Sequence, residues 1–562
     1  MLPSLPPQLQ ALPSIPLWYG IICGSIILTL FVVRVFTIVY RYFSAKIVFY
    51  FSNRLLYPIA FAQVSKRMSR WNFLLVAGYI LVNVVFVAIG PNNREAWSLR
   101  ASRMAMMNLF ILIFGKKISV IGQVLGMKYN SYANIHYLTG YLAVIEGLLH
   151  VFLSASQVTP ISKIWPDPGF RGAVCLGAIF LTGFFQNKIY EIHKIAHWIL
   201  IIILIQAIWA HMAERQMIYP VLWVSVWAFT VALSTLWRLS SILRGRGLGK
   251  VCIKKFDTAL QVHLKVRKPW RPSPGTYVHL TIPFLSTFSL FQSHPFAIAW
   301  WPEEVCDAES NFVFLIKPHR GVTLDLLQCS ADKWYTAIVD GPYGISFPID
   351  TYGTVFIIAT GIGIAGVLPY IKNTITGYNS FDVKTQEICL IWHLEREGDG
   401  EWVEDWMNEM LQADTKYILR IELYTPTRKT SDTQRGIMKN YGQHGRLRKI
   451  YEEPNWPSIF DQCMGRKRGK TAILTCVETE VEACLRELVV QHRDPNVSMH
   501  VHEFHPPAFG NMLKLFGDKN GINMKEIKQD SRTSPVALTR PNSNSGRRVT
   551  FESGGHRNMH KR

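Results

Sequence analysis

Four histidines lie inside two of the most apolar segments of the chain, where an ionisable side chain is unusual. His136 and His150 are 14 residues apart, and so are His197 and His211. On an α-helix, two residues 14 positions apart differ in direction by only about 40°, after about four turns, and lie about 21 Å apart along the axis. Both histidines of a pair therefore face the same side, near opposite edges of a bilayer. Two facing imidazoles at each of two depths suit two bis-histidine haems, which would carry single electrons.

The alternative for a single intramembrane histidine is a hydrogen bond to a neighbouring helix. Four histidines with matched spacing argue against it here. His193 is also nearly in phase with His211, but it lies beside Glu191 and Lys194. We expect His193 to be a polar residue at a loop edge, and the matched spacing favours His197 as the ligand.

A glycine-rich stretch follows a continuous apolar run at residues 354–359. Thr360, Gly361, Gly363 and Gly366 carry a G-x-G-x-x-G between that expected strand and an apolar helix. Glycines let the backbone approach a pyrophosphate, and the helix N-terminus favours its negative charge. The motif alone is equally consistent with a tight turn. The motif follows, in the sequence, the membrane segments that contain the four histidines, and this order favours nucleotide binding.

Composition separates the chain into two unlike halves. The 562 residues are 49% hydrophobic and 18% charged, with a net charge of +21, and most long apolar runs precede about residue 240. This excludes a uniformly soluble or a disordered protein. No nucleic-acid-binding signature accompanies the basic charge, so we expect no nucleic-acid partner. The nine cysteines show no C-x-x-C pair, which argues against a disulfide framework or a structural zinc site.

Seven apolar segments predict an integral membrane protein, because a span needs roughly 20 apolar residues. They are residues 17–40, 71–90, 103–114, 132–154, 172–185, 192–212 and 218–237. The third is the shortest and is alternatively re-entrant or interfacial. The first continues too far for a cleavable signal peptide. Basic residues are concentrated after the first, third and seventh segments, so the N-terminus is expected outside and the part after residue 240 in the cytosol.

The second half predicts two domains that contain strands. Alternating strands at 250–256, 260–266 and 276–282 are typical of a small antiparallel barrel. Strands at 354–359, 387–393, 419–425 and 471–476 alternate with helices, and 426–470 is expected to be an irregular insertion. The predicted divisions are an N-terminal segment 1–16, a membrane domain 17–240, a barrel 241–350, an α/β domain 351–510 and a disordered basic tail 511–562. We expect the tail to lie beside anionic lipid headgroups.

Over about residues 70–505 these features resemble the fungal ferric/cupric reductase transmembrane components, relatives of the NADPH oxidases. Besides the histidines and the glycine loop, three motifs carry the resemblance. The stretch 293–299 is similar to an HPF-[ST] flavin motif, with Ala297 at the hydroxyl position. The others are the G-P-Y-G at 341–344 and the segment 315–326. The resemblance implies a polytopic α-helical membrane domain of the bis-haem ferric reductase type. A cytosolic ferredoxin-reductase-like module follows, with an antiparallel β-barrel FAD domain and an α/β nucleotide-binding domain.

The resemblance also implies roles for individual residues. The implied flavin and nucleotide contacts are His294, Pro295, Phe296, Lys317, Thr323, Gly341, Pro342, Tyr343, Gly344, Arg396 and Cys476. Three places depart from the family. Cys476-Val477-Glu478 replaces a Cys-Gly-Pro, so Cys476 is either functional or structural. Glu395 occupies the position where the family often has an arginine that binds the NADPH 2′-phosphate. The neighbouring Arg396 is the alternative residue for that role, one position later. Family members usually end with an aromatic residue over the flavin, whereas this chain continues, so Phe504, Phe509 or neither covers the flavin.

The implied activity is that of a transmembrane NADPH-dependent ferric-chelate or cupric reductase that supports iron and copper uptake. The implied order is cytosolic NADPH, FAD, an inner haem b, an outer haem b, then an external metal chelate. A flavin accepts an electron pair and releases electrons singly, so no side chain acts as general acid or base at the metal. The expected location is the plasma membrane, with the vacuolar membrane as the alternative. The competing functions are a superoxide-producing NADPH oxidase and a degenerate, non-enzymatic membrane relative.

Overall fold

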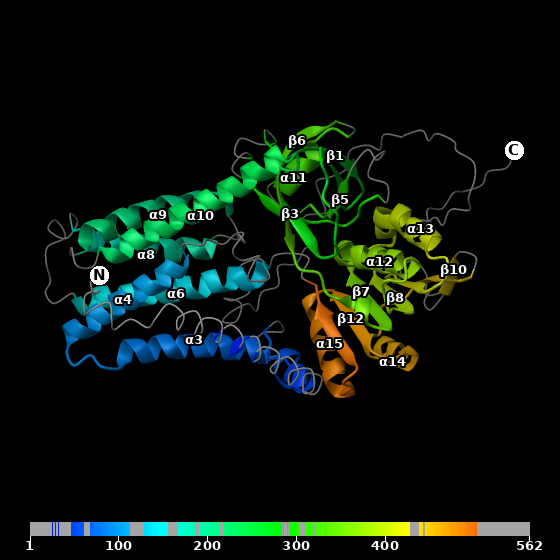
Figure 1. The fold of residues 1–562 in the computed structure, drawn as a ribbon, viewed down its shortest axis with the longest axis horizontal. Helices are drawn as coiled ribbons and strands as arrows, with labels where there is room; N and C mark the ends of the chain where they lie inside the picture. The colour runs from blue at the N-terminus through cyan, green and yellow to red at the C-terminus, as the bar shows by residue number, and fades with distance from the viewer. Residues whose placement is uncertain are drawn as a thin grey trace, which may run out of the picture.

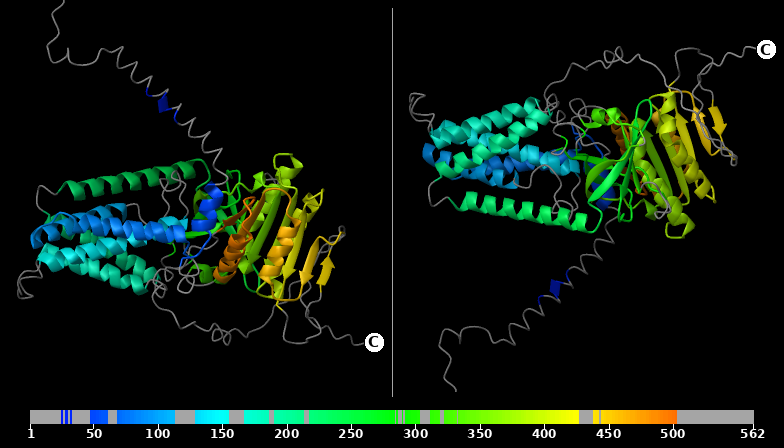
Figure 2. Two further views of the ribbon diagram at one scale, coloured as in Figure 1. Left: turned by 90° about the horizontal axis from the view of Figure 1, so that it is seen from below. Right: turned by 90° about the horizontal axis from the view of Figure 1, so that it is seen from above.

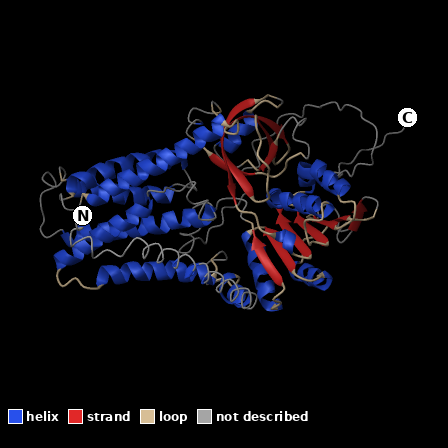
Figure 3. Cartoon of the chain, in the orientation of Figure 1, coloured by secondary structure: helices blue, strands red, loops and turns tan. Residues whose placement is uncertain are grey.

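The computed structural model describes most of the chain between residues 47 and 502. The described ranges are 47–60, 68–112, 129–154, 167–185, 190–212, 217–283, 292–302, 311–318, 322–331, 333–426, 438–441 and 444–502, with a few single positions besides. A helical bundle occupies one end of the molecule and two sheets occupy the other (Figures 1 and 3). Views from below and above show the same division (Figure 2). The two unlike halves predicted from composition are therefore two structural halves.

The bundle consists of long helices with outward-facing apolar side chains. The helices are α3 (Arg70–Ala88), α4 (Arg94–Leu112), α6 (Tyr129–Ser154), α8 (Pro168–Phe185), α9 (Tyr190–His211) and α10 (Ile218–Leu243). Among the described residues, five helices, all of these except α4, are long and apolar enough to cross a bilayer. Leu81, Ile202 and Phe229 are each more than 60% exposed, so their surroundings must be apolar. The chain is an integral membrane protein.

Two of the seven expected spans differ from the structure or lie outside it. The segment 17–40 lies almost wholly outside the described residues. The segment expected at 103–114 is only the second half of α4, which begins at Arg94, so the expected short element was wrong. Asn93 causes the earlier start, because its side chain accepts a hydrogen bond from the amide of Ala96 at 2.8 Å.

Small buried residues let the helices approach closely. Ala101 and Ala105 of α4 are buried, as is Ala143 of α6, and these two helices share an extensive contact. In the neighbouring pair, Gly172 of α8 faces Ala207 and Leu204 of α9. Small residues at such contacts are the usual means of close packing in a membrane, where lipid supplies no hydrophobic driving force between helices.

The first sheet is the antiparallel barrel that the alternating pattern predicted. Its strands are β1 (Leu248–Lys255), β2 (Leu260–Val266), β3 (Thr276–Thr281), β4 (His294–Ala297), β5 (Phe312–Ile316) and β6 (Tyr335–Gly344), in the order β4-β3-β6-β1-β2-β5. A bridge between Trp300 and Val313 joins the two edges. A short helix, α11 (Val322–Gln328), follows β5. Buried apolar side chains such as Val262, Leu264 and Phe314 fill the interior.

The second sheet has seven strands in the order β10-β11-β9-β8-β7-β12-β13. These are β7 (Thr354–Thr360), β8 (Glu387–His393), β9 (Leu419–Tyr424), β10 (Met438–Tyr441), β11 (Leu447–Ile450), β12 (Thr471–Cys476) and β13 (Val497–Val501). All are parallel except the edge strand β10. Helices α12 (Ile364–Asn379) and α13 (Glu404–Ala413) cover one face, and α14 (Trp456–Arg466) and α15 (Thr479–His492) cover the other.

The stretch 426–470, expected to be irregular, instead contains two strands and a helix. Strand β11 pairs in parallel with β9 and extends the sheet, and α14 follows it. The expectation failed because β11 is only four residues long and holds two cations. One of these, Lys449, is wholly buried and donates to Glu397 at 3.0 Å. A buried ion pair of this kind leaves no apolar period in the sequence.

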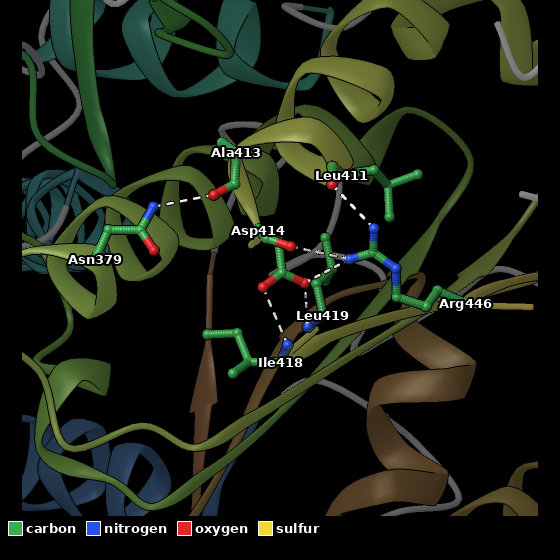
Figure 4. A network of polar contacts seen from close by, with 7 residues as sticks. All are labelled: Asn379, Leu411, Ala413, Asp414, Ile418, Leu419 and Arg446. Atoms are coloured by element: carbon green, nitrogen blue, oxygen red, sulfur yellow. Dashed lines mark hydrogen bonds and ion pairs between the residues drawn. The ribbon is translucent and has the colours of Figure 1, made fainter. Parts of the chain in front are cut away.

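Asp414 connects α13 to the strands beside it (Figure 4). The side chain is only 2% exposed. It accepts hydrogen bonds from the amides of Ile418 and Leu419 at 3.0 and 2.9 Å, and from Arg446 at 2.8 Å. Arg446 also donates to the carbonyl of Leu411 at 3.0 Å. One buried carboxylate therefore sets the turn into β9 and holds the approach to β11.

The membrane half is attached to both sheet domains. Arg238, near the end of α10, forms a 3.0 Å ion pair with Asp340 of β6. Tyr57, from the segment before α3, is buried against the second sheet and accepts the amide of Met499 at 2.9 Å. Arg486 of α15 donates to the carbonyl of Leu56 at 3.1 Å. These contacts, which the sequence did not indicate, limit how the halves move relative to each other.

Candidate electron-transfer site

The four histidines meet in the two pairs that their spacing predicted. The ring centroids of His136 and His197 are 6.5 Å apart, and those of His150 and His211 are 6.2 Å apart. The first pair lies toward the end of the bundle where α10 enters the barrel, because α9 runs antiparallel to α10 and begins at Tyr190. Figure 1 shows α10 leading directly into the sheet half. The second pair lies toward the other end.

The separation within each pair fits a shared metal between the rings. A metal–imidazole bond is about 2 Å long, and a ring nitrogen lies about 1 Å from its ring centre, so axial imidazoles have centroids about 6 Å apart. Both pairs match that value, and within the described residues no group of three or more histidine, cysteine, aspartate or glutamate side chains offers an alternative metal site. The donor set therefore suits two bis-histidine haems.

Ser98 of α4 supports the second pair. The Nδ1 atom of His150 lies 2.8 Å from the Ser98 hydroxyl and 3.0 Å from the Ser98 carbonyl oxygen. The Ser98 hydroxyl is also 2.6 Å from the hydroxyl of Ser154. Contacts at Nδ1 leave Nε2 as the nitrogen for a metal, which is how outer contacts usually orient a histidine ligand. Nothing in the sequence marked Ser98 for this role.

We expect Ser98→Ala to weaken haem binding at His150 by about tenfold, the lower end of the usual effect of such contacts. The effect is small because the Ser98 backbone carbonyl still accepts a hydrogen bond from Nδ1. Haem content and haem midpoint potentials of the purified variant would measure it. Ser102→Ala, on the same helix, is the matched control, because the Ser102 hydroxyl donates to the Leu99 carbonyl of its own helix. Equal effects of the two changes would contradict the assignment.

The glycine loop lies where the second sheet reverses its strand order. Strands β8 and β9 extend from β7 on one side, and β12 and β13 extend on the other. The crevice between the carboxyl ends of β7 and β12 is where such sheets bind ligands. Thr360 ends β7, Gly361 and Gly363 lie in the short 3-10 turn that follows it, and Cys476 ends β12. The sequence motif and the topology therefore point to the same edge.

Backbone contacts fit the glycine loop closely against β12 and β8. A Cβ at Gly363 would collide with the carbonyl of Cys476, and Trp392 donates to the carbonyl of Gly361 at 2.9 Å. The amide of Glu478 donates to the Thr360 hydroxyl at 2.9 Å. A proline at 478, as in Cys-Gly-Pro, has no N–H for that bond. The departure at 476–478 therefore supplies a contact to the loop.

We expect Gly363→Ala to weaken binding of a nicotinamide dinucleotide by at least about tenfold, because overpacking costs typically 1–3 kcal/mol and displaces the loop from β12. Gly398→Ala is the matched control, since nothing lies within 4 Å of a Cβ built there. Titration of each purified variant with NADH and NADPH, followed by tryptophan fluorescence, would measure both. Unchanged affinity in Gly363→Ala would contradict this placement of the dinucleotide.

Two charged residues predicted to bind cofactors form ion pairs with other residues of the chain. Lys317 forms an ion pair with Glu395, whose carboxylate lies against Gly361, so both side chains sit over the glycine loop. Arg396 reaches back to Asp257 of the barrel at 3.5 Å and is 59% exposed. Gly366 is buried in the first turn of α12, and Thr323 lies in the first turn of α11. The roles proposed for these residues remain predictions.

The predicted flavin motifs lie on neighbouring strands of the barrel. His294, Pro295 and Phe296 form most of β4, and Gly341, Pro342, Tyr343 and Gly344 end β6, with β3 between them. Burial and the adjacent Asp340 carboxylate raise the pKa of Tyr343 above its ordinary range, so its hydroxyl stays protonated and donates to Asp340. Phe504 and Phe509, the candidates for covering the flavin, lie outside the described residues.

The barrel and the second sheet share a fixed interface. Gln261 of β2 donates to the carbonyl of Trp402 at 2.6 Å, and Thr258 donates to Asp399 at 2.9 Å. The rings of Trp300 and Trp406 are stacked 5.5 Å apart and almost parallel, at 6°. These contacts set the separation of the flavin and nucleotide motifs. No sequence pattern indicated them.

Comparison with known proteins gives matches over both sheet domains. Residues 248–347 match a family described as an FAD-binding domain, and residues 352–490 match one described as a ferric reductase NAD binding domain. Ferric/cupric reductase transmembrane component 2 of Saccharomyces cerevisiae is 25% identical over 54% of this chain and 45% of its own length. Ferric reductase transmembrane component 5 of the same yeast is 25% identical over 66% of this chain and 55% of its own length. A probable cell surface ferric reductase of Aspergillus oryzae is 22% identical over 55% of this chain and 44% of its own length. The chain thus spans about half the length of the curated relatives that it matches.

Proposed function

Because this chain is a member of the ferric reductase family, we propose that it is a transmembrane reductase of ferric or cupric chelates that draws electrons from cytosolic NAD(P)H. The observation that carries the proposal is the pairing of His136 with His197 and of His150 with His211, at centroid separations of 6.5 and 6.2 Å. A dinucleotide-binding sheet alone would suit many soluble reductases. Two histidine pairs at different depths of a membrane bundle, joined to that sheet, suit electron movement across a bilayer.

When bound, NAD(P)H, FAD and two b-type haems would supply a hydride donor, a converter from electron pairs to single electrons, and two one-electron carriers. The chain's own residues hold and orient them. The histidine pairs would ligate the two haems, and Ser98 directs His150. The loop at Gly361 and Gly363 would receive the dinucleotide pyrophosphate, as the motif implies.

The chain's contacts also support a fixed path from the sheets to the membrane. The ion pair of Arg238 with Asp340 ties the last membrane helix to the strand that ends in the G-P-Y-G motif. The Trp300–Trp406 stack holds the barrel against the second sheet. Because both connections hold neighbouring parts of the chain together, neither carrier site would need a large domain movement to reach the next.

We propose the orientation that the basic loops predict, with both sheet domains in the cytosol and the second histidine pair near the outside. The acceptor is then an external ferric or cupric chelate, and the role is iron or copper uptake at the plasma membrane, with the vacuolar membrane as the alternative. NADPH is the proposed hydride donor by family resemblance.

The test is anaerobic turnover of the purified chain supplied with haem, FAD and NADPH, with a ferric chelate as acceptor. Formation of iron(II) without oxygen would support a metalloreductase. Turnover only after oxygen is admitted, with superoxide detected, would replace it with an oxidase. If dithionite reduces the haems while NADPH reduces neither haem nor acceptor, the degenerate relative becomes the better explanation.

A further inference from the structure

A cluster of polar side chains crosses the interior of the bundle, away from both histidine pairs. It joins three helices through Tyr79 and Asn83 of α3, Asn108 of α4 and Glu146 of α6, and we refer to these four residues as the polar cluster. Asn108 Nδ2 donates to Asn83 Oδ1 and to Glu146 Oε2, both at 2.8 Å. The Tyr79 hydroxyl donates to Asn108 Oδ1. Asn83, Asn108 and Glu146 are each no more than 5% exposed.

Glu146 is the one carboxyl group of this cluster, and only one of its two oxygens has a hydrogen-bond partner among the described residues. Its Oε2 accepts from Asn108, while its Oε1 is buried and has no hydrogen-bond partner among the residues that the structure describes. A carboxyl that served only to join helices would have both oxygens satisfied, as buried polar atoms usually are. The unused oxygen is therefore the feature that a purely structural role does not explain.

No described cation neutralises Glu146. The titratable groups that face it are Tyr79 from α3 and, one turn along its own helix, His150. Helix α4 presents the amide of Asn108, while Cys175 of α8 packs beside Val144, on the opposite side of α6. None of the charged side chains of the packed helices forms an ion pair with Glu146; they are Arg70 on α3, Arg94, Glu95, Arg100 and Arg103 on α4, and Arg171 on α8. An ionised Glu146 therefore needs positive charge from another source.

The second histidine pair is the nearest place for such a charge. Glu146 precedes His150 by four residues, about 6 Å along the helix axis, and follows His136 by ten, about 15 Å. A ferric haem between two neutral imidazoles carries a net positive charge at its core, which reduction removes. The charge that favours an ionised Glu146 would thus disappear when an electron arrives.

From this arrangement we infer that Glu146 is a proton-binding site linked to the metal centre held by His150 and His211. The inference rests on the proposed haem at that pair. As one electron enters the centre, Glu146 takes one proton from water at Oε1 and becomes a neutral acid, while Oε2 keeps its bond from Asn108. When the electron leaves for the acceptor, Glu146 releases the proton, so the charge of the site stays constant and no other bond changes.

The test is a redox titration of both haems in the purified full-length chain between pH 6 and pH 8, followed by absorbance. One midpoint potential should fall as pH rises, by up to about 59 mV for each tenfold change in proton concentration. Glu146→Gln, which keeps an acceptor for Asn108, should remove that slope and keep the bis-histidine spectrum. Tyr79→Phe is the matched control, because it shortens the polar cluster but leaves Glu146, so it should keep the slope. A pH-independent wild type, or an equal slope in Glu146→Gln, would overturn the inference.

A second readout separates Glu146 from the haem propionates, which also titrate. The reduced-minus-oxidised infrared difference spectrum of the wild type should contain the carbonyl band of a newly protonated carboxylic acid, and Glu146→Gln should lack it. A band unchanged in Glu146→Gln would assign the proton elsewhere and overturn the inference. If the chain shows no bis-histidine haem spectrum, the proposed function fails and the inference fails with it. An intact spectrum with no Glu146-dependent proton removes the inference alone.

Discussion

Replacement of His197 by alanine is expected to abolish electron transfer from NAD(P)H to an external ferric chelate, by more than about a hundredfold. Loss of a contact to a metal ligand alone costs 10–100-fold, and this change removes a ligand itself. His136 would face an empty position across a 6.5 Å gap between ring centroids. The absorbance spectrum should show one bis-histidine haem instead of two.

His193→Ala is the matched control for that change. His193 lies one turn earlier on α9, with its ring centroid 5.6 Å from that of His197, so it is the nearest candidate for a substitute ligand. We expect it to keep both haems and most of the activity. Retention of two haems in His197→Ala, together with loss of one in His193→Ala, would transfer the ligand role to His193.

Asp414→Ala is expected to destabilise the second sheet domain by about 3–5 kcal/mol, the usual cost of removing one partner of a buried ion pair. The change leaves Arg446, which is 18% exposed, without its carboxylate, and it removes the acceptor of two amides in the turn before β9. Hydrogen exchange of the full-length chain would measure it. Protection of the Ile418 and Leu419 amides should fall by a hundredfold or more, since about 1.4 kcal/mol corresponds to tenfold.

Two further variants show whether charge or shape matters at Asp414. Asp414→Asn keeps one acceptor oxygen and should cost less than Asp414→Ala. Asn379→Ala removes an exposed bond to the carbonyl of Ala413, at 3.0 Å in the same network, and should change protection little. If all three variants lost the same protection, the network would not act through the buried ion pair.

Much of the fold follows from local patterns in the chain. The strands expected at 260–266, 387–393 and 471–476 agree with β2, β8 and β12 residue for residue. Their apolar runs or alternations are bounded by turn residues, and such patterns depend only on near neighbours. The pairing of the four histidines also followed from spacing, because helical geometry relates residues 14 apart without knowledge of the neighbouring helix.

Apart from the start of α4, which the neighbouring Asn93 determines, the errors and omissions lie where a distant residue determines the local structure. The strand β11 exists because β9 and Glu397 accept a polar segment containing Lys449. The sequence does show Glu146 as an acidic residue within an apolar span, and an ionisable residue inside a membrane span indicates a functional site. Asn83 and Asn108 complete this hydrogen-bonded cluster from two other helices, and no sequence pattern indicated that they would meet Glu146.

The sequence by itself therefore determined the division into membrane bundle, barrel and α/β sheet, together with the two depths of histidine and the glycine loop. Each of these rests on periodicity or on a motif within one stretch of chain. Only the tertiary structure decided that Ser98 contacts the Nδ1 atom of His150, that Lys317 forms an ion pair with Glu395, and that the Oε1 atom of Glu146 is buried without a hydrogen-bond partner among the described residues. The physical reason is that hydrogen bonds and ion pairs act over about 3 Å in space, whatever the separation along the chain.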